Sequence, residues 1–208
     1  WYTFHFYFYK KLFLMIIEKI KKYNLILGSN SPRRKKIIEE MGFKVNIIPA
    51  NIDETIKEEI SLEKIPVFLA NEKSKALKNL IKQNDILITA DTVVIFENKI
   101  LNKPKNKVDA IKTLSNLSSK THKVITGVCI RTFKSIKSFS CSTKVTFEKI
   151  TDEEINYYIQ KYEPFDKAGS YGIQEWIGLI GIKKIEGSYS NVVGLPSSRL
   201  YQELKMLF

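Results

Sequence analysis

The 208-residue sequence is poor in cysteine and lacks long apolar runs. Its two cysteines, Cys129 and Cys141, stand twelve positions apart without a C-x-x-C pair, which excludes a disulfide scaffold and indicates a reducing compartment. No stretch approaches the 18 apolar residues of a membrane span, so we expect a soluble, cytoplasmic protein without a membrane partner. Hydrophobic content of 44% with 27% charged residues excludes a disordered or collagen-like chain.

Acidic residues and arginine are also scarce. The chain has 34 basic against 22 acidic residues and a net charge of +12, but only four of the basic residues are arginines. A basic excess favours nucleic acid as a partner. Arginine, however, is the residue that reads bases and binds phosphates in a bidentate manner. A lysine-driven nucleic-acid binder therefore remains a minor hypothesis, and we expect no nucleic-acid partner.

The length corresponds to one large domain or two closely fused lobes. Residues 1–14 are rich in aromatic side chains and carry their charges in the middle, unlike a secretory signal. We expect them to lie outside the fold, as a misplaced start, an organelle-targeting extension or an ordinary appendage. Residues 15–208 are expected to form a single domain.

Helical and strand patterns alternate along the chain, which predicts an α/β fold with a mixed, twisted sheet flanked by helices. A hairpin is expected at residues 97–98, a capping box at 151–154 and a helix break near Pro66. The predicted strands cover residues 25–27, 45–48, 86–96, 100–101, 123–133, 139–147 and 177–185. The predicted helices cover residues 32–41, 62–82, 108–117, 151–162 and 198–207.

The loop from Gly28 to Ser31 opens onto Pro32, Arg33 and Arg34 at the start of a predicted helix. Unpaired backbone N–H groups and the positive end of the helix dipole attract an anion, and two arginines in the first turn strengthen that attraction. The alternative is a solvated helix start. The pattern G-x-x-x-x-G-K-[ST] is absent, so this is not a Walker loop.

Asp91 interrupts a run that otherwise reads as a buried strand, and a buried carboxylate needs a metal, a cation or hydrogen bonds. Glu54 could share its site, because two acids near a polyphosphate can hold Mg²⁺. The alternatives are a turn-capping aspartate and a plain acidic loop.

Other candidates are less specific. Lys73, taken alone, reads as a solvated charge, whereas Lys103 follows the predicted hairpin and could return to the Asp91 site. The glycine-punctuated segment 166–174 ends at Gln174, whose amide can read a base edge, although a plain loop fits equally well. His122 is assigned no chemistry.

Eight motifs together resemble the Maf family of nucleoside triphosphate pyrophosphatases. They occur in the family's order and spacing over about residues 24–204: SNSPRR, IDE, NEKSKA, ADTVV, NKP, TGV, EPFDKAGSYGIQ and GSYSNVVGLP. The resemblance implies two lobes around a central cleft, similar to the ITPase-like pyrophosphatases. It also implies metal-dependent hydrolysis of a nucleoside triphosphate to the monophosphate and pyrophosphate, with Mg²⁺ or Mn²⁺.

The same resemblance implies roles for single residues. Arg33, Thr92 and Gln174 match the dTTP/UTP branch and would set substrate preference, while Asp91 would accept a proton from the attacking water. Phosphate-binding positions match Ser29, Arg34, Lys73 and Lys103, and Glu54 would bind the metal with Asp91. We expect the Gln174 amide to suit the O4 and N3–H edge of uracil or thymine.

Three departures from the family pattern stand near these motifs: Asn30 and Ser170 replace the usual Gly and Ala, and Glu175-Trp176 replaces a small, glycine-rich pair. The last predicts an altered base pocket. The main alternative function is a non-catalytic regulatory protein that inhibits septum formation. A homodimer is considered as the oligomeric state, and dTTP, UTP and modified pyrimidine triphosphates are considered as substrates.

Overall fold

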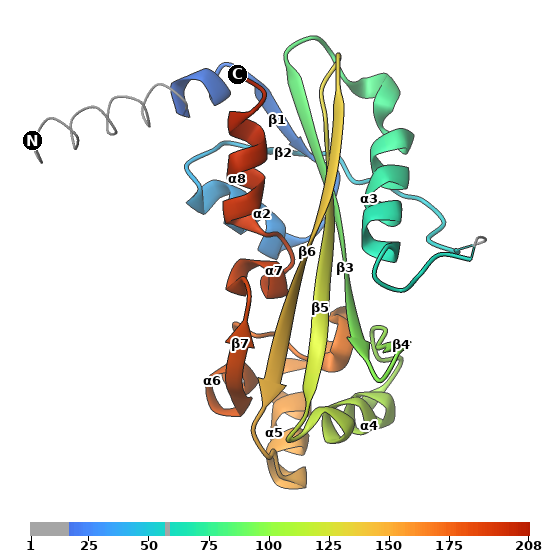
Figure 1. Ribbon diagram of the computed structural model, residues 1–208. Helices are drawn as coiled ribbons and strands as arrows, with labels where there is room; N and C mark the ends of the chain where they lie inside the picture. Colours follow the sequence, from blue (N-terminus) through green and yellow to red (C-terminus); the bar gives the residue numbers. More distant parts are fainter. Residues whose placement is uncertain (1–16, 57–58) are drawn as a thin grey trace, which may run out of the picture.

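The computed structural model describes residues 17–56 and 59–208, and the predicted appendage at 1–14 lies outside them. A seven-stranded sheet runs through the molecule in the order β2-β1-β3-β5-β6-β7, with β4 paired to β3 outside this path (Figure 1). β1 is parallel to β2 and β3, and the other pairs are antiparallel. The predicted mixed α/β sheet is therefore confirmed. The strands are β1 (Asn24–Leu27), β2 (Asn46–Ile47), β3 (Asp85–Phe96), β4 (Lys99–Ile100), β5 (Thr121–Arg131), β6 (Ile136–Phe147) and β7 (Ile182–Glu186).

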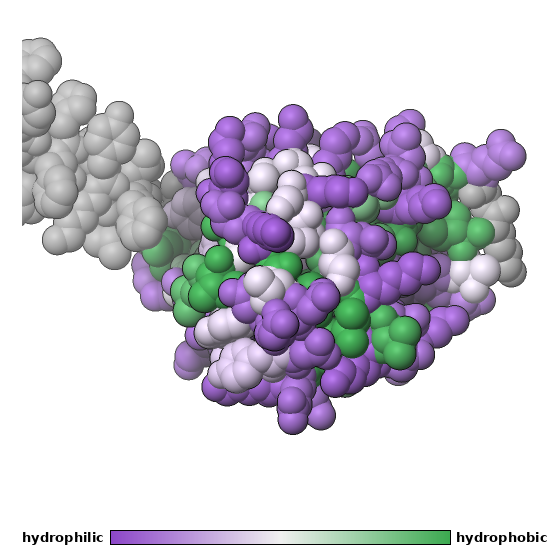
Figure 2. Space-filling view, turned by 90° about the horizontal axis from the view of Figure 1, so that it is seen from below, coloured by the Kyte–Doolittle hydropathy of each residue, from purple (hydrophilic) through white to green (hydrophobic). Residues whose placement is uncertain are grey.

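Helices cover both faces of the sheet. In Figure 1, α3 lies on one side of the long strands, α2, α7 and α8 lie on the other, and α4 and α5 close the lower end. Seen from that end, the surface is mainly hydrophilic with separate hydrophobic patches (Figure 2). The helices are α2 (Pro32–Glu40), α3 (Ile65–Ala76), α4 (Lys107–Leu117), α5 (Asp152–Tyr162), α6 (Trp176–Gly181), α7 (Tyr189–Val193) and α8 (Ser197–Lys205). No helix in the described ranges is long and apolar enough to cross a membrane.

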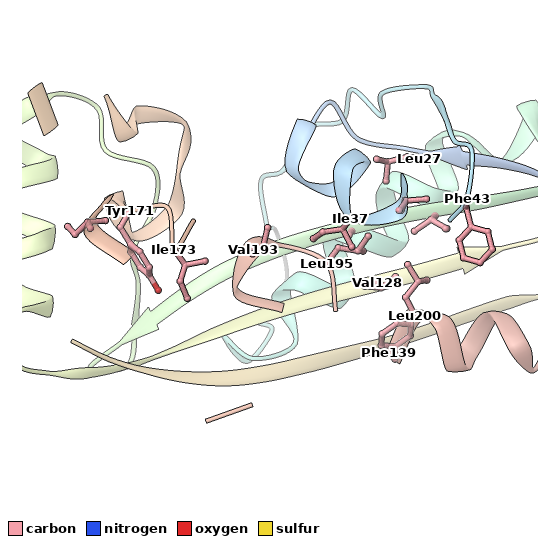
Figure 3. Packing of buried hydrophobic residues seen from close by; sticks show 14 of the residues in the cluster. Leu27, Ile37, Phe43, Val128, Phe139, Tyr171, Ile173, Val193, Leu195 and Leu200 are labelled. Atoms are coloured by element: carbon pink, nitrogen blue, oxygen red, sulfur yellow. The ribbon is translucent and has the colours of Figure 1, made fainter. Parts of the chain in front are cut away.

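The two faces of the sheet bury different clusters because side chains alternate along each strand. On the α3 face, Ile65 and Leu69 pack with Val93, Ile95 and Ile125. The opposite face carries the larger core, which extends from Tyr171 and Ile173 at one end, through Val193 and Leu195, to Phe43 and Leu200 at the other (Figure 3). Residues that follow each other on β3 therefore belong to different layers.

Several local predictions are confirmed. Glu97 and Asn98 both have positive φ (47° and 56°), as the two central residues of a type I′ hairpin require. The capping box of α5 is present, with Thr151 and Glu154 each accepting the other's backbone N–H. The helix at 108–117 and the strand at 86–96 are shifted by only one residue at their starts.

Other local predictions are wrong. Pro66 does not break a helix but lies in the first turn of α3, where its missing N–H has no intrahelical partner to lose. The helix predicted to reach residue 82 ends at Ala76 and is followed by a 3₁₀ turn, Lys78–Leu80. The strand predicted at 177–185 is helical up to Gly181 and extended only in β7, and α7 was not predicted at all.

One edge of β3 is left open where the site forms. β1 stops pairing at Leu27, opposite Ile88, and the backbone N–H of Gly28 makes the last contact with Ile88 O at 2.8 Å. Pairing resumes where Leu101 N donates to Val94 O at 2.8 Å. Between these points no described strand covers this edge of β3, and the loop after β1 leaves the sheet here.

Candidate active site

A cavity of about 900 Å³ lies at the open edge of β3. Its walls come from the loop after β1, the start of α2, α3, β3 and residues 166–175. The structure brings together here every site residue that the sequence predicted. These are Ser29, Arg33, Arg34, Glu54, Lys73, Asp91, Thr92, Lys103 and Gln174.

The loop after β1 and the first turn of α2 place Arg34. Ser31 caps α2 by accepting the Arg34 backbone N–H. The guanidinium donates to Gly194 O at 2.9 Å, to Ser29 Oγ at 3.1 Å and to Thr92 Oγ1 at 3.1 Å. Burial lowers the pKa of Arg34, and the nearby negative charge of Asp91 acts in the opposite direction. The result is a fixed positive charge at a helix N-terminus, an arrangement suited to phosphate oxygens.

Asp91 is held by a lysine from the helix that covers its face of the sheet. Lys73 Nζ lies 2.6 Å from Asp91 Oδ1 and 2.7 Å from Glu54 Oε1. The side chains of Lys73 and Asp91 are only 10% and 14% exposed, so the solvated charge that Lys73 alone predicted is wrong. Oδ2 of Asp91 accepts no hydrogen bond from residues 17–56 or 59–208, which leaves it available to a water.

Glu54 and Asp91 are the carboxylates with which the cavity could hold a metal beside Lys73. Within the described residues no group of three or more metal-binding side chains is present. Mg²⁺ is usually bound by one or two carboxylates, several waters and the phosphates of the substrate rather than by a complete protein cage. Two carboxylates beside an anion-binding loop fit such an ion, with a triphosphate supplying further oxygens.

Thr92 follows Asp91 but points to the other face of the sheet. Its hydroxyl accepts the Arg34 hydrogen bond and lies 2.9 Å from Thr126 Oγ1. Thr92 therefore helps to set the position of the Arg34 guanidinium.

A chain of ion pairs crosses from the start of α2 to the opposite wall. Arg33 Nη1 lies 2.9 Å from Asp166 Oδ2, whose Oδ1 lies 2.6 Å from Lys167 Nζ. Lys167 also contacts Glu175 Oε1 at 3.1 Å. Burial alone would raise the pKa of Asp166, but the hydrogen bonds and charges of Lys167 and Arg33 outweigh it and hold that pKa below its usual value.

Gln174 and Lys103 are exposed predicted residues, as Glu54 is. Gln174 lies in a turn closed by Glu175 N donating to Gly172 O at 3.0 Å. Lys103 forms no ion pair with any residue that the structure describes, so it remains available to a phosphate. Sequence reasoning singled out the segment 166–174 but missed Lys167 and Tyr158 as individual residues, because their partners become visible only in three dimensions.

Comparison with known proteins identifies the family. A family model described as Maf-like protein matches residues 24–207. A dTTP/UTP pyrophosphatase of Phocaeicola vulgatus is 50% identical over 194 residues, covering 92% of this chain and 100% of the relative. Proteins of the same name from Porphyromonas gingivalis and Christiangramia forsetii are 47% and 49% identical, covering 91% and 92% of this chain and 97% of each relative. The chain therefore belongs to the Maf family.

Proposed function

We propose that this chain is a nucleoside triphosphate pyrophosphatase that hydrolyses dTTP and UTP to the monophosphate and pyrophosphate. The observation that carries the proposal is the pairing, in one cavity, of the Asp91–Lys73–Glu54 group with the Arg34 and Ser29 anion site. Relatives 47–50% identical over nearly the whole chain bear the name dTTP/UTP pyrophosphatase.

The proposed chemistry is attack of water on the α-phosphorus. Asp91 Oδ2 orients the water and takes its proton as the new P–O bond forms. The bond between the α-phosphorus and the bridging oxygen breaks, and pyrophosphate leaves with the electron pair. Lys73 keeps the Asp91 carboxylate in place through Oδ1.

The cations of the cavity stabilise the negative charge that develops on the phosphate oxygens in the transition state. Arg34, already oriented by Gly194 and Thr92, faces the phosphates together with Ser29. Lys103 binds from the opposite wall. Groups that are fixed before the reaction stabilise a transition state without a cost of reorganisation. A divalent ion bound at Glu54 and Asp91 would supply further neutralisation of phosphate charge.

Gln174 and Arg33 are proposed to set the preference for the base. The Gln174 side chain makes no hydrogen bond with the described part of the chain, so both its donor and its acceptor are available. These two groups suit the N3–H and O4 edge of uracil and thymine. Because the substrates are free nucleotides, we place the activity in the cytoplasm.

A pyrophosphate-release assay over a panel of triphosphates with Mg²⁺ or Mn²⁺ tests the proposal. We expect dTTP and UTP to be the best substrates and Asp91→Asn to lower kcat by at least ~100-fold, the usual contribution of a general base. Glu97→Gln, in the exposed hairpin outside the cavity, is the matched carboxylate control and should keep full activity. Unchanged turnover in Asp91→Asn, or no turnover of any triphosphate by the intact chain, would contradict the proposal and favour the regulatory alternative.

A further inference from the structure

Both ends of the turn that carries Gln174 are hydrogen-bonded to one hydroxyl group, that of Tyr158. Gly172 N donates to the Tyr158 hydroxyl oxygen at 3.0 Å, and the same hydroxyl donates to Glu175 Oε2. The turn is also closed by its own backbone bond from Glu175 N to Gly172 O. Gln174 lies between the two fastened residues, on the wall of the cavity. Tyr158 therefore ties the turn to α5.

The Glu175 carboxylate is folded back against the start of the turn. A Cβ atom added to Gly172 would lie 2.7 Å from Glu175 Cδ, so the two residues are in direct contact. The second carboxylate oxygen, Oε1, lies 3.1 Å from Lys167 Nζ. Both oxygens are thus occupied, and a cation balances the negative charge that the sequence placed beside the base pocket.

The hydroxyl of Tyr158 is well suited to a fixed structural role. The residue has no exposed surface, and its ring stacks on Tyr162 at 5.3 Å. Burial, followed by the hydrogen bond to Glu175, raises the pKa of the Tyr158 hydroxyl, which therefore keeps its proton and remains a donor. Burial also makes the loss of any of these hydrogen bonds costly.

We propose that Tyr158 and Glu175 are positioning residues that set base selectivity by holding Gln174 in place, an inference that rests on the proposed function. An amide reads a base only when it is held within about 0.5 Å of its working position. Gln174 has no side-chain partner in the described structure, so the turn supplies that placement. Without the Tyr158 hydroxyl the turn keeps its own backbone bond and the contact of Glu175 with Lys167, but Gly172 loses its tie to α5 and, as a glycine, permits other conformations.

The test compares UTP with CTP, whose ring presents a donor where UTP presents O4. Tyr158→Phe removes only the hydroxyl. We expect it to lower the UTP:CTP ratio of kcat/KM roughly tenfold, because small displacements of a binding group are costly. Tyr157→Phe is the matched control. It removes a hydroxyl from the preceding residue of α5, and because that hydroxyl bonds Lys161 rather than the turn, the variant should keep the wild-type ratio.

A double-variant experiment separates positioning from a general structural effect. In a Gln174→Ala background, Tyr158→Phe should change the UTP:CTP ratio less than twofold, because the group that it positions is gone. Glu175→Ala, which removes both carboxylate contacts, should lower the ratio at least as much as Tyr158→Phe. It replaces Tyr158→Phe if that variant fails to fold.

The outcomes distinguish this inference from the proposed function. A wild-type chain that releases no pyrophosphate from UTP or dTTP contradicts the proposed function itself. If the wild type hydrolyses UTP and Tyr158→Phe lowers UTP and CTP turnover equally, the positioning role is overturned while the function stands. The same holds if Tyr158→Phe lowers the ratio equally with and without Gln174.

Discussion

Lys73 is a charged residue in a largely buried environment. Its side chain is 10% exposed and lies between Glu54 and Asp91, at 2.7 and 2.6 Å. A buried ammonium is tolerated here because two carboxylates replace its water, and Asp91 is tolerated on a buried strand for the same reason. The three charges therefore stabilise one another, and removal of one leaves the others uncompensated.

We expect His122 to make a contribution to stability that is lost in acid. Its ring is 2% exposed, lies against Phe147 and has Nε2 2.8 Å from the Tyr171 hydroxyl, and burial lowers its pKa to about 4. An unfolded histidine binds a proton near pH 6.5, so between pH 6.5 and 4 the unfolded state binds more protons and stability falls as the pH falls. We expect this group to remove about 1 kcal/mol of unfolding free energy between pH 7.5 and 5.5.

Urea unfolding of the wild type and of His122→Asn at both pH values measures this contribution. Because the substitution also alters the starting stability, the quantity compared is the change of the unfolding free energy with pH. The His122→Asn chain should lose less stability on acidification than the wild type, by about the same 1 kcal/mol. An identical change in both proteins would show that His122 does not cause it.

At this scale the sequence identifies residues that stand in a motif and misses those defined by a distant partner. Ser29 and Arg34 are five positions apart in one capped loop, so their joint use was predictable. Lys73 is one of thirty lysines, and only the packing of α3 on β3 places it beside Asp91. The Glu175 carboxylate was expected to disturb the base pocket, but a tyrosine seventeen positions earlier holds it.

The contact of α3 with β5 places Lys73, and one glycine permits it. A Cβ atom at Gly127 would lie 2.2 Å from the backbone of Pro66 and Val67, so any side chain forces the first turn of α3 away from the sheet. We expect Gly127→Ala to lower the unfolding free energy by about 2 kcal/mol, as overpacking does. Displacement of Lys73 and Asp91 should also lower kcat roughly tenfold or more.

Thermal unfolding and pyrophosphate release check both effects. The control is Ser140→Ala, because Ser140 pairs with Gly127 across the ladder and is exposed. It should shift stability by less than about 0.5 kcal/mol, as is usual for a surface substitution. If Gly127→Ala retains wild-type stability and activity, then α3 is not held rigidly at this contact.

Elements with strong local signals were predictable, and those fixed by tertiary contacts were not. The capping box and the hairpin each follow from two or three neighbouring residues. The α6 segment is a short apolar run, which hydrophobic periodicity cannot assign to helix or strand. It is helical here because Gly178 lies against the Ile173 carbonyl, where a Cβ atom would approach to 2.0 Å, and its N–H bonds Glu175 O.

At the scale of the whole molecule, the basic residues that give the net charge of +12 form two populations. A small group of cations lines the cavity, where their positions are fixed by hydrogen bonds or ion pairs in the cases of Arg33, Arg34, Lys73 and Lys167. Many other lysines are exposed, and the surface viewed from below is mainly hydrophilic (Figure 2). Mobile surface charges attract any polyanion weakly, whereas fixed charges beside a base-reading turn discriminate among anions.

Ligand-induced stabilisation of Asp91→Asn distinguishes these two populations, because this variant should bind UTP without consuming it. A ligand that binds only the folded chain at 100 times its Kd stabilises it by about 2.7 kcal/mol. For a chain of this length that raises the midpoint of thermal unfolding by roughly 5–10 °C.

Inorganic tripolyphosphate at the same concentration should give a smaller shift, because it lacks the base. Adding Arg34→Ala should reduce the UTP shift by more than half, since the oriented guanidinium is lost. Equal shifts with both ligands, unchanged by Arg34→Ala, would instead assign the binding to the lysine-rich surface.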